Sequence, residues 1–146
     1  MPRHIVCLTF DFDAQSGFIS RGMNTQTPLS RGEFGHRVAS GRILDTLKAR
    51  GLPAPWYAPG FTIESHPRAC EAVVEGGHEI AHHSWSHIPP AEQTREEEEA
   101  DLVRANDAIE RLTGRKARGY RSPSWDLSES TVDLLIEHGF LYDSSL

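Results

Sequence analysis

Short apolar runs alternate with amphipathic stretches along this chain, and the pattern predicts repeated strand–helix units. The first continuous apolar run, Ile5–Phe10, predicts a buried strand. The stretch Glu33–Arg50 predicts a helix, because its apolar residues recur at helical spacing, and Gly51 is suited to end it. The apolar stripe of this helix consists of Val38, Ile43, Leu44 and Leu47.

The same pattern continues along the rest of the sequence. Further strands are predicted at Ala54–Ala58, His78–His82 and Arg118–Arg121, and another begins at Phe140–Tyr142. Further helices are predicted at Ile63–Glu75, from Thr94 to Gly114 and from Ser128 to Glu137. Because strands alternate with helices, we expect an α/β fold with a parallel sheet.

Two stretches carry more specific signals. Thr94 followed by Glu97 forms a capping box, which predicts that a helix begins there. The stretch from Asp13 to about Gly32 has little periodicity and predicts a long loop. Two interpretations of this loop are equally open: it binds substrate, or it is an ordinary surface loop.

The composition fits one ordinary domain spanning residues 1–146. With 38% hydrophobic and 25% charged residues, the chain has enough apolar material for a packed core. A net charge of −6 argues against a nucleic acid or an anionic membrane as a partner. No run approaches a membrane span and no signal-peptide pattern precedes Asp11, so a cytoplasmic protein is predicted. Both cysteines, Cys7 and Cys70, are expected as reduced thiols in the interior.

Two polar motifs follow predicted strands and contain metal-binding groups. The first is TFDFD at Thr9–Asp13, and the second is HHSWSH at His82–His87. One Asp with two His is a typical ligand set for a catalytic divalent ion that keeps a position open for water. The other Asp is then free to act as a base. Each motif also has a plainer interpretation, as two solvated acids or as a histidine-rich polar loop.

The spacing within each motif supports a shared site. Asp11 and Asp13 project to the same side if strand geometry persists, and His83 and His87 would share one face of a helical turn. His82 would then point elsewhere and is expected to make a structural hydrogen bond. Since active sites of βα barrels lie at the C-terminal ends of strands, we expect a metal-dependent hydrolase.

A third motif, RSPSW at Arg121–Trp125, follows another predicted strand. Arg121 is suited to pair with Asp11, which would hold the carboxylate in place and keep it ionised. Trp125 is suited to wall a substrate pocket. Surface packing is the plainer interpretation of both residues. The motif supports a functional site only because it follows the other two motifs in order along the chain.

In this order, the motifs TFDFD, HSWSH and RSPSW resemble those of the polysaccharide deacetylase (NodB-homology) family of carbohydrate esterases. The stretches LSRGEFG, GHEI and YDSSL, which begin at Leu29, Gly77 and Tyr142, are similar to its peptidoglycan-deacetylase-like branch without a signal peptide. The resemblance covers nearly the whole chain. It implies a distorted (β/α) barrel that hydrolyses an amide, usually an N-acetyl group on an amino sugar.

The resemblance also implies a role for each site residue. The implied metal ligands are Asp13, His83 and His87, and the metal is usually zinc. Asp11 is the implied base that takes a proton from the attacking water, and Arg121 orients it. We expect a backbone N–H near Pro123–Trp125 to help hold the oxyanion.

One feature of the family has no clear counterpart here. Its general acid is typically a His near the C-terminal end of the barrel, whereas His138, the only His after Arg121, lies at a predicted helix end that favours a structural role. Such a barrel usually needs at least roughly 200 residues, so we interpret the chain as the N-terminal part of one. An open sheet edge needs a cover, for which a homo-oligomer is one solution.

Three functions remain open at this point. The preferred one is deacetylation of N-acetylated sugars in a polysaccharide or peptidoglycan. The second is hydrolysis of small cyclic amides or imides, as in allantoinase-type enzymes. This reaction breaks the same kind of C–N bond, and such small substrates suit a cytoplasmic protein. The third is a truncated carbohydrate-binding module without activity, against which the presence of both Asp11 and Arg121 argues. The expected partner is accordingly a carbohydrate or a small amide.

Overall fold

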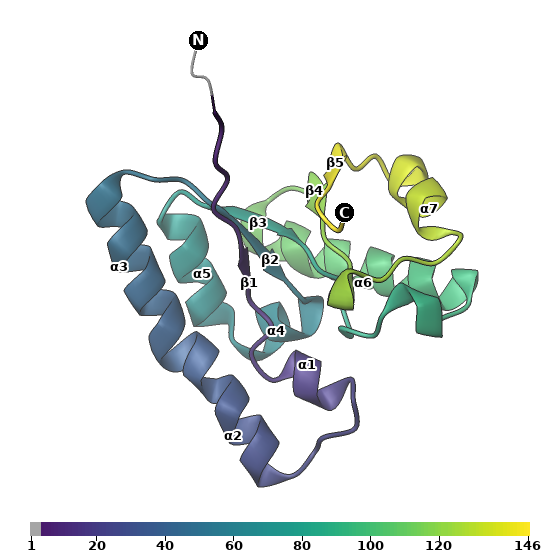
Figure 1. Ribbon diagram of the computed structural model, residues 1–146, viewed down its shortest axis with the longest axis horizontal. Helices are drawn as coiled ribbons and strands as arrows, with labels where there is room; N and C mark the ends of the chain where they lie inside the picture. The colour runs from purple at the N-terminus through teal and green to yellow at the C-terminus, as the bar shows by residue number, and fades with distance from the viewer. Residues whose placement is uncertain (1–3) are drawn as a thin grey trace.

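A parallel sheet forms the centre of the molecule in the computed structural model, which describes residues 4–146 (Figure 1). In these residues the sheet has five strands in the order β1-β2-β3-β4-β5. They are β1 (Phe10–Asp11), β2 (Pro55–Ala58), β3 (Glu79–His82), β4 (Gly119–Tyr120) and β5 (Tyr142–Asp143). Every neighbouring pair is parallel, which confirms the predicted α/β class.

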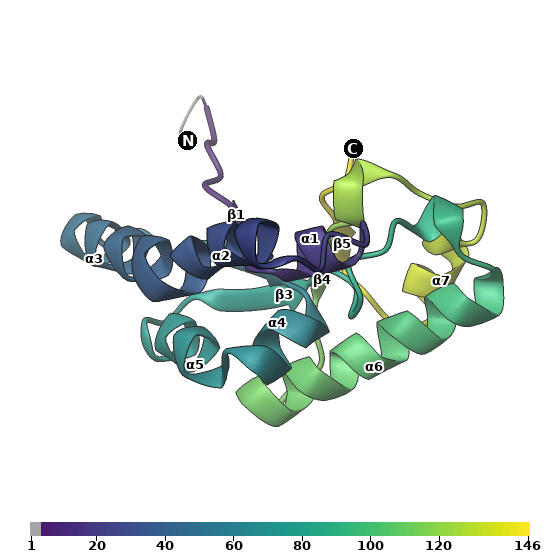
Figure 2. The ribbon, with the colours of Figure 1, turned by 90° about the horizontal axis from the view of Figure 1, so that it is seen from below.

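Helices connect the strands and cover the sheet. They are α1 (Ser16–Ile19), α2 (Gln26–Phe34), α3 (Ser40–Arg50), α4 (Gly60–Ser65), α5 (Pro67–Glu75), α6 (Arg95–Thr113) and α7 (Thr131–Glu137). A π-helical turn, Gly35–Ala39, joins α2 to α3, and short 3₁₀ turns span Pro90–Glu92 and Pro123–Trp125. Figures 1 and 2 show α3, α5 and α6 following one another along the outside of the sheet.

The main core lies between these helices and one face of the sheet. Trp56 and Ile80 are register partners on β2 and β3, and they pack with Leu47 of α3, Val73 of α5 and Ile109 of α6. Successive residues of a strand face opposite sides. The neighbouring pair Asp11 and Tyr57 therefore lies on the other face, away from the helices.

The first strand is shorter than predicted, and its apolar run is not buried. Ile5 and Val6 are 85% and 83% exposed, and Cys7 is exposed as well. The reason is the register between β1 and β2. Phe10 pairs with Trp56, so Pro55, the first residue of β2, lies opposite Thr9. The residues that precede Thr9 therefore extend past the start of β2. The prediction of an interior thiol is wrong for Cys7 and confirmed for Cys70.

The predicted loop from Asp13 to Gly32 and the predicted helix Ile63–Glu75 also differ. The loop contains α1 and most of α2, whose one buried residue is Gly32, so no apolar stripe marks the helix in the sequence. The helix Ile63–Glu75 is two helices that meet at His66. His66 precedes Pro67, and a residue before proline is disfavoured in the helical region.

Other predicted boundaries are confirmed. The Thr94 side chain accepts from the Glu97 backbone N–H and the Glu97 side chain accepts from that of Thr94, which is the predicted capping box of α6. Gly51 ends α3 in the left-handed conformation. Across residues 4–146, no helix has both the length and the apolar character to span a bilayer.

Candidate metal and catalytic site

Three of the predicted ligands meet at the C-terminal edge of the sheet. Asp13 follows β1, and His83 and His87 follow β3. The distance from Asp13 Oδ1 to His83 Nε2 is 3.5 Å, and that from Asp13 Oδ2 to His87 Nε2 is 3.3 Å. One donor atom from each residue lies within 4.8 Å of the others. Asp13 therefore meets two histidines that follow it by 70 and 74 positions in the sequence.

The histidines are brought together by an irregular loop and not by the helical turn that their spacing suggested. Residues 83–87 contain no helix, and two of them, Ser84 and His87, have φ values of 58° and 61°. These left-handed residues turn the chain sharply, so both rings face the same side. The prediction of a common face is confirmed, but the predicted helix is wrong.

His83 is held in one orientation by its second ring nitrogen. Its Nδ1 lies 2.7 Å from the carbonyl oxygen of Arg121, so Nδ1 carries the proton and Nε2 is left as an acceptor facing Asp13. Burial lowers the pKa of His83 from its ordinary value, against the opposing charge of Asp13. A neutral imidazole with a free Nε2 is the form in which His binds a metal.

Asp13 is positioned through its backbone. Its carbonyl oxygen accepts from the Ser16 N–H at 3.0 Å, from the Ser16 hydroxyl at 2.7 Å and from the Thr62 hydroxyl at 2.7 Å. Burial raises the pKa of the Asp13 carboxyl, but the hydrogen bond from His87 and the positive charge that the two histidines carry when protonated outweigh it and hold the pKa below its usual range. The carboxylate is therefore ionised at neutral pH.

The donor set fits a divalent cation. Asp13 Oδ1 is buried and has no hydrogen-bond partner among the described residues. A buried, ionised oxygen without a partner is costly, and a cation beside it removes that cost. Two imidazoles and one carboxylate are also the protein ligands of catalytic zinc sites that leave a fourth position open.

The second aspartate is paired with the predicted arginine. Arg121 Nη1 donates to Asp11 Oδ1 at 2.7 Å, with Asp11 on β1 and Arg121 directly after β4. The Arg121 side chain is 11% exposed and that of Asp11 is 26% exposed. A charge-assisted hydrogen bond that is partly shielded from water orients the carboxylate firmly. The predicted pairing of the two residues is confirmed as geometry.

Arg121 makes further contacts that sequence reasoning missed. Its Nη2 donates to the hydroxyls of Thr9 at 3.0 Å and Ser144 at 2.6 Å, and its guanidinium carbon lies 4.0 Å from the centre of the Tyr57 ring. These partners come from three other strands or their ends. No local pattern marks a hydroxyl or a ring as the partner of a distant arginine, so the sequence held no signal for them.

The loop after Arg121 holds the last predicted residue. Trp125 is 60% exposed, so most of this residue is open to solvent and it does not form a buried pocket wall. The Trp125 N–H already donates to the Ser122 carbonyl at 3.0 Å, and Pro123 has no N–H. Of the three residues predicted to offer an oxyanion donor, only Ser124, with φ of 59°, has an amide left to do so.

Two other histidines have structural contacts. His82 is fully buried and its Nε2 lies 3.1 Å from the Leu102 carbonyl, as expected for a structural residue. His138 Nε2 lies 3.1 Å from Glu99 Oε1, between α7 and α6. Neither ring takes part in the cluster around Asp13.

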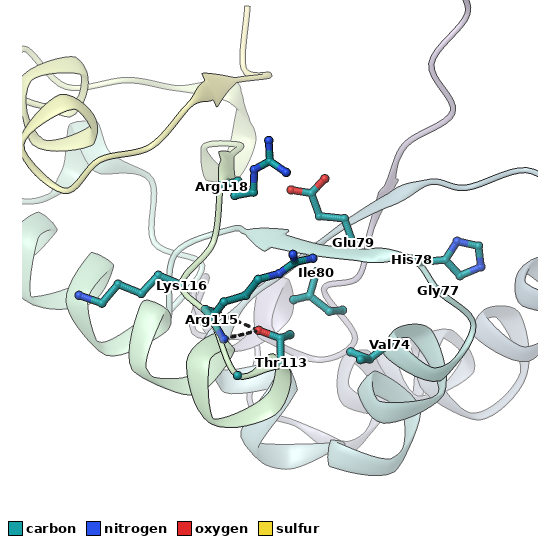
Figure 3. Close-up of a pocket in the computed structure, with 10 residues that line it drawn as sticks. Val74, Gly77, His78, Glu79, Ile80, Thr113, Arg115, Lys116 and Arg118 are labelled. Atoms are coloured by element: carbon teal, nitrogen blue, oxygen red, sulfur yellow. Dashed lines mark hydrogen bonds between the residues drawn. The ribbon is translucent and has the colours of Figure 1, made fainter.

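A separate cavity lies at the opposite end of the strands. Figure 3 shows this cavity of about 310 Å3, lined among others by Val74, His78, Glu79, Arg115, Lys116 and Arg118. These residues precede or begin β3 and β4, whereas the metal cluster and Arg121 follow the strand ends. The cavity is therefore no part of the site around Asp13.

Comparison with known proteins places the chain in a family. The family model for polysaccharide deacetylase matches residues 1–142. A peptidoglycan deacetylase of Helicobacter pylori is 37% identical over 144 residues, which are 97% of this chain and 49% of that protein. A peptidoglycan deacetylase-like protein of Gibberella zeae is 34% identical over 146 residues, which are 97% of this chain and 43% of that protein.

A solved structure agrees. A Mycobacterium smegmatis protein that carries the name of a polysaccharide deacetylase has a TM-score of 0.91 and 34% identity, covering 96% of this chain and 50% of that one. The chain belongs to the polysaccharide deacetylase family. It spans about half the length of these relatives.

Proposed function

We propose that this chain is the N-terminal part of a metal-dependent deacetylase that removes N-acetyl groups from sugars of a polysaccharide or peptidoglycan. The observation that carries the proposal is the convergence of Asp13, His83 and His87 beside the Asp11–Arg121 pair. Pure binding has no use for a carboxylate that an arginine holds in place next to a metal site. The relatives' greater length supports a domain that continues beyond the part matched here.

Asp13, His83 and His87 would hold the cation, which we propose to be zinc. A divalent cation in this position supplies Lewis acidity, which lowers the pKa of water and polarises an amide carbonyl. The chain's own contribution is to keep His83 neutral with Nε2 free and Asp13 ionised, as their contacts already do.

Asp11 is the proposed general base. It accepts the proton of the attacking water, a role that requires an ionised carboxylate held in a fixed orientation. Arg121 supplies that orientation through its hydrogen bond to Asp11 Oδ1. The Ser124 amide is the proposed backbone donor for the oxyanion. Trp125 is the proposed substrate contact, because an exposed aromatic ring can stack on a sugar.

The test is metal binding and substrate choice on the same protein. Titration of the metal-free protein with Zn²⁺ should give one site per chain, and the His83→Ala variant should lose it. A His78→Ala variant is the matched control, because His78 lies at the other end of the strands and should bind zinc normally.

Because the proposal implies a longer domain, activity is tested on the protein extended to that domain. Loaded with zinc, it should release acetate from N-acetylglucosamine oligomers and leave cyclic imides intact. Ring opening of the imides with no acetate release would favour the allantoinase-type alternative. Binding of the oligomers without turnover would favour a binding module. A protein that binds no zinc would overturn the proposed function.

A further inference from the structure

The loop that carries both histidine ligands is held from behind by α6. The Trp85 N–H donates to Asp101 Oδ2 at 2.6 Å, and the Ser86 N–H donates to Asp101 Oδ1 at 3.0 Å. A single carboxylate on α6 therefore binds two successive amides in the middle of the loop between His83 and His87. Both bonds are charge-assisted, which makes them the stronger kind.

Other polar groups of the loop backbone are paired as well. The Gly60 and Phe61 N–H groups, at the start of α4, donate to the carbonyls of Ser84 at 3.0 Å and Trp85 at 3.1 Å. The His87 N–H donates to the Ser84 hydroxyl at 2.8 Å. The loop is thus fixed by α4 on its carbonyl side and by α6 on its amide side.

The backbone of this loop is strained, and the contacts with α4 and α6 stabilise it. Ser84 and His87 are non-glycine residues with positive φ, a conformation that is energetically costly for residues with a Cβ. Without outside partners, the loop would relax to conformations that move the two rings apart. The bonds to Asp101 span the two residues that lie between these strained positions.

The Trp85 side chain anchors the same loop to the same helices. Its Nε1–H donates to Glu64 Oε2 of α4 at 3.0 Å, and the Arg104 guanidinium of α6 lies 3.2 Å from the ring centre. A Cβ on Gly60 would collide with this ring. Trp85 therefore points away from the cluster around Asp13, toward the supporting helices.

We propose that Asp101 is a positioning residue of the metal site: by binding the amides of Trp85 and Ser86, it sets the spacing of His83 and His87 before the metal arrives. The inference rests on the proposed metal function for its consequence, but the loop contacts stand without it. The role requires two acceptor oxygens, which Asp has and Asn lacks.

Asp101→Asn is the direct test, because the side chain keeps its size and loses one acceptor. Removing such an outer contact typically lowers metal affinity about 10- to 100-fold, and we expect a zinc dissociation constant raised within that range. The visible spectrum of the Co²⁺-loaded variant should shift, since the two imidazoles no longer approach with the same geometry. The melting temperature of the metal-free protein checks that the variant folds.

Asp107→Asn is the matched control. Asp107 is an exposed residue of α6, and its replacement removes the same charge from the same helix. Wild-type affinity and spectrum are expected for this variant. An equal loss in both variants would mean that the charge of α6 acts at long range, and wild-type behaviour of Asp101→Asn would likewise overturn the positioning role.

A measurement without metal separates this inference from the proposed function. Amide hydrogen exchange of the metal-free wild-type protein should show Trp85 and Ser86 protected, and Asp101→Asn should lower both protection factors by about tenfold or more. Fast exchange of both amides in the wild type would refute the inference, and this needs no folded variant. Protected amides in a protein that binds no zinc would refute only the metal function.

Discussion

Arg121 donates a 2.7 Å hydrogen bond to Asp11 across 110 residues of sequence, joining the end of β4 to the end of β1. The same guanidinium reaches Thr9 before β1 and Ser144 after β5, so one side chain ties three strands together near the cluster of Asp13, His83 and His87. Arg121 is 9% exposed as a residue, and its bonds are therefore little weakened by water. Arg121 therefore both orients the proposed base and contributes to the assembly of the sheet.

The Asp11→Asn variant should separate catalysis from metal binding. An amide cannot accept the proton of water as a base, so we expect turnover to fall about 10²- to 10⁴-fold. Zinc affinity should stay at the wild-type value, because Asp11 faces Arg121 and is not in the ligand cluster. Acetate release and zinc titration on the same sample check both. Substantial turnover by the variant would remove Asp11 from the mechanism.

The Arg121→Lys variant should lose activity although the positive charge is kept. A lysine lacks the planar fork that reaches Asp11, Thr9 and Ser144 together, and we expect kcat to fall about 10- to 100-fold. Arg118→Lys is the control, since Arg118 is exposed at the other end of β4. Equal activity of the two variants would show that only the charge of Arg121 matters.

Acid should destabilise the fold through His82. Burial lowers the pKa of His82 to about 4 in the folded protein, so the ring stays neutral while the unfolded chain takes up a proton below its ordinary pKa of 6.5. Above pH 6.5 the ring is neutral in both the folded and the unfolded protein, so His82 does not affect stability there. As the pH drops from 6.5 to 4, the free energy of unfolding falls by about 3 kcal/mol in all. Urea unfolding of wild type and His82→Gln across this range should show a flatter profile for the variant. Parallel profiles would contradict the assignment to His82.

The two cysteines should differ in reactivity. Cys7 is exposed, whereas burial, assisted by the charge of Glu71, raises the pKa of the Cys70 thiol to about 12. Since the thiolate is the reactive form, iodoacetamide should label one thiol per native chain and two in denaturant. Mass spectrometry locates the label, and a native Cys7→Ser variant should take up none. Rapid native labelling of Cys70 would show that α5 opens easily.

Two glycine substitutions should change the stability of the protein in opposite directions. In Gly60→Ala the new methyl group meets the Trp85 ring and the backbone of Ala105, and we expect a loss of about 1–3 kcal/mol in stability. Gly41→Ala places its methyl group in open space within α3 and should gain about 0.4–1 kcal/mol. Thermal melts of the two variants compare the effects directly, and a stabilised Gly60→Ala would mean that Trp85 moves without cost.

Some site residues could be recognised in the sequence because their chemistry is local. Asp13 and His83 follow predicted strands, His87 lies four residues after His83, and the carboxyl ends of parallel strands share one edge. Their convergence in the structure confirms that argument. Asp101 gave no such signal, since it is one of many acidic residues on α6 and only its position beside the loop distinguishes it. Trp125 as a substrate contact, a cytoplasmic location and a homo-oligomer stay predictions.

The sequence by itself determined the alternation of strands and helices, the capping of α6 and the residue types of the site, because periodicity, caps and donor chemistry are properties of short segments. Only the tertiary structure decided which apolar residues are buried. Ile5–Phe10 is as apolar as a core strand, but the register with β2 leaves Ile5 and Val6 without neighbours. Likewise, the irregular loop of His83 and His87 exists because α4 and α6 bind its backbone, and partners so distant in sequence are set by packing alone.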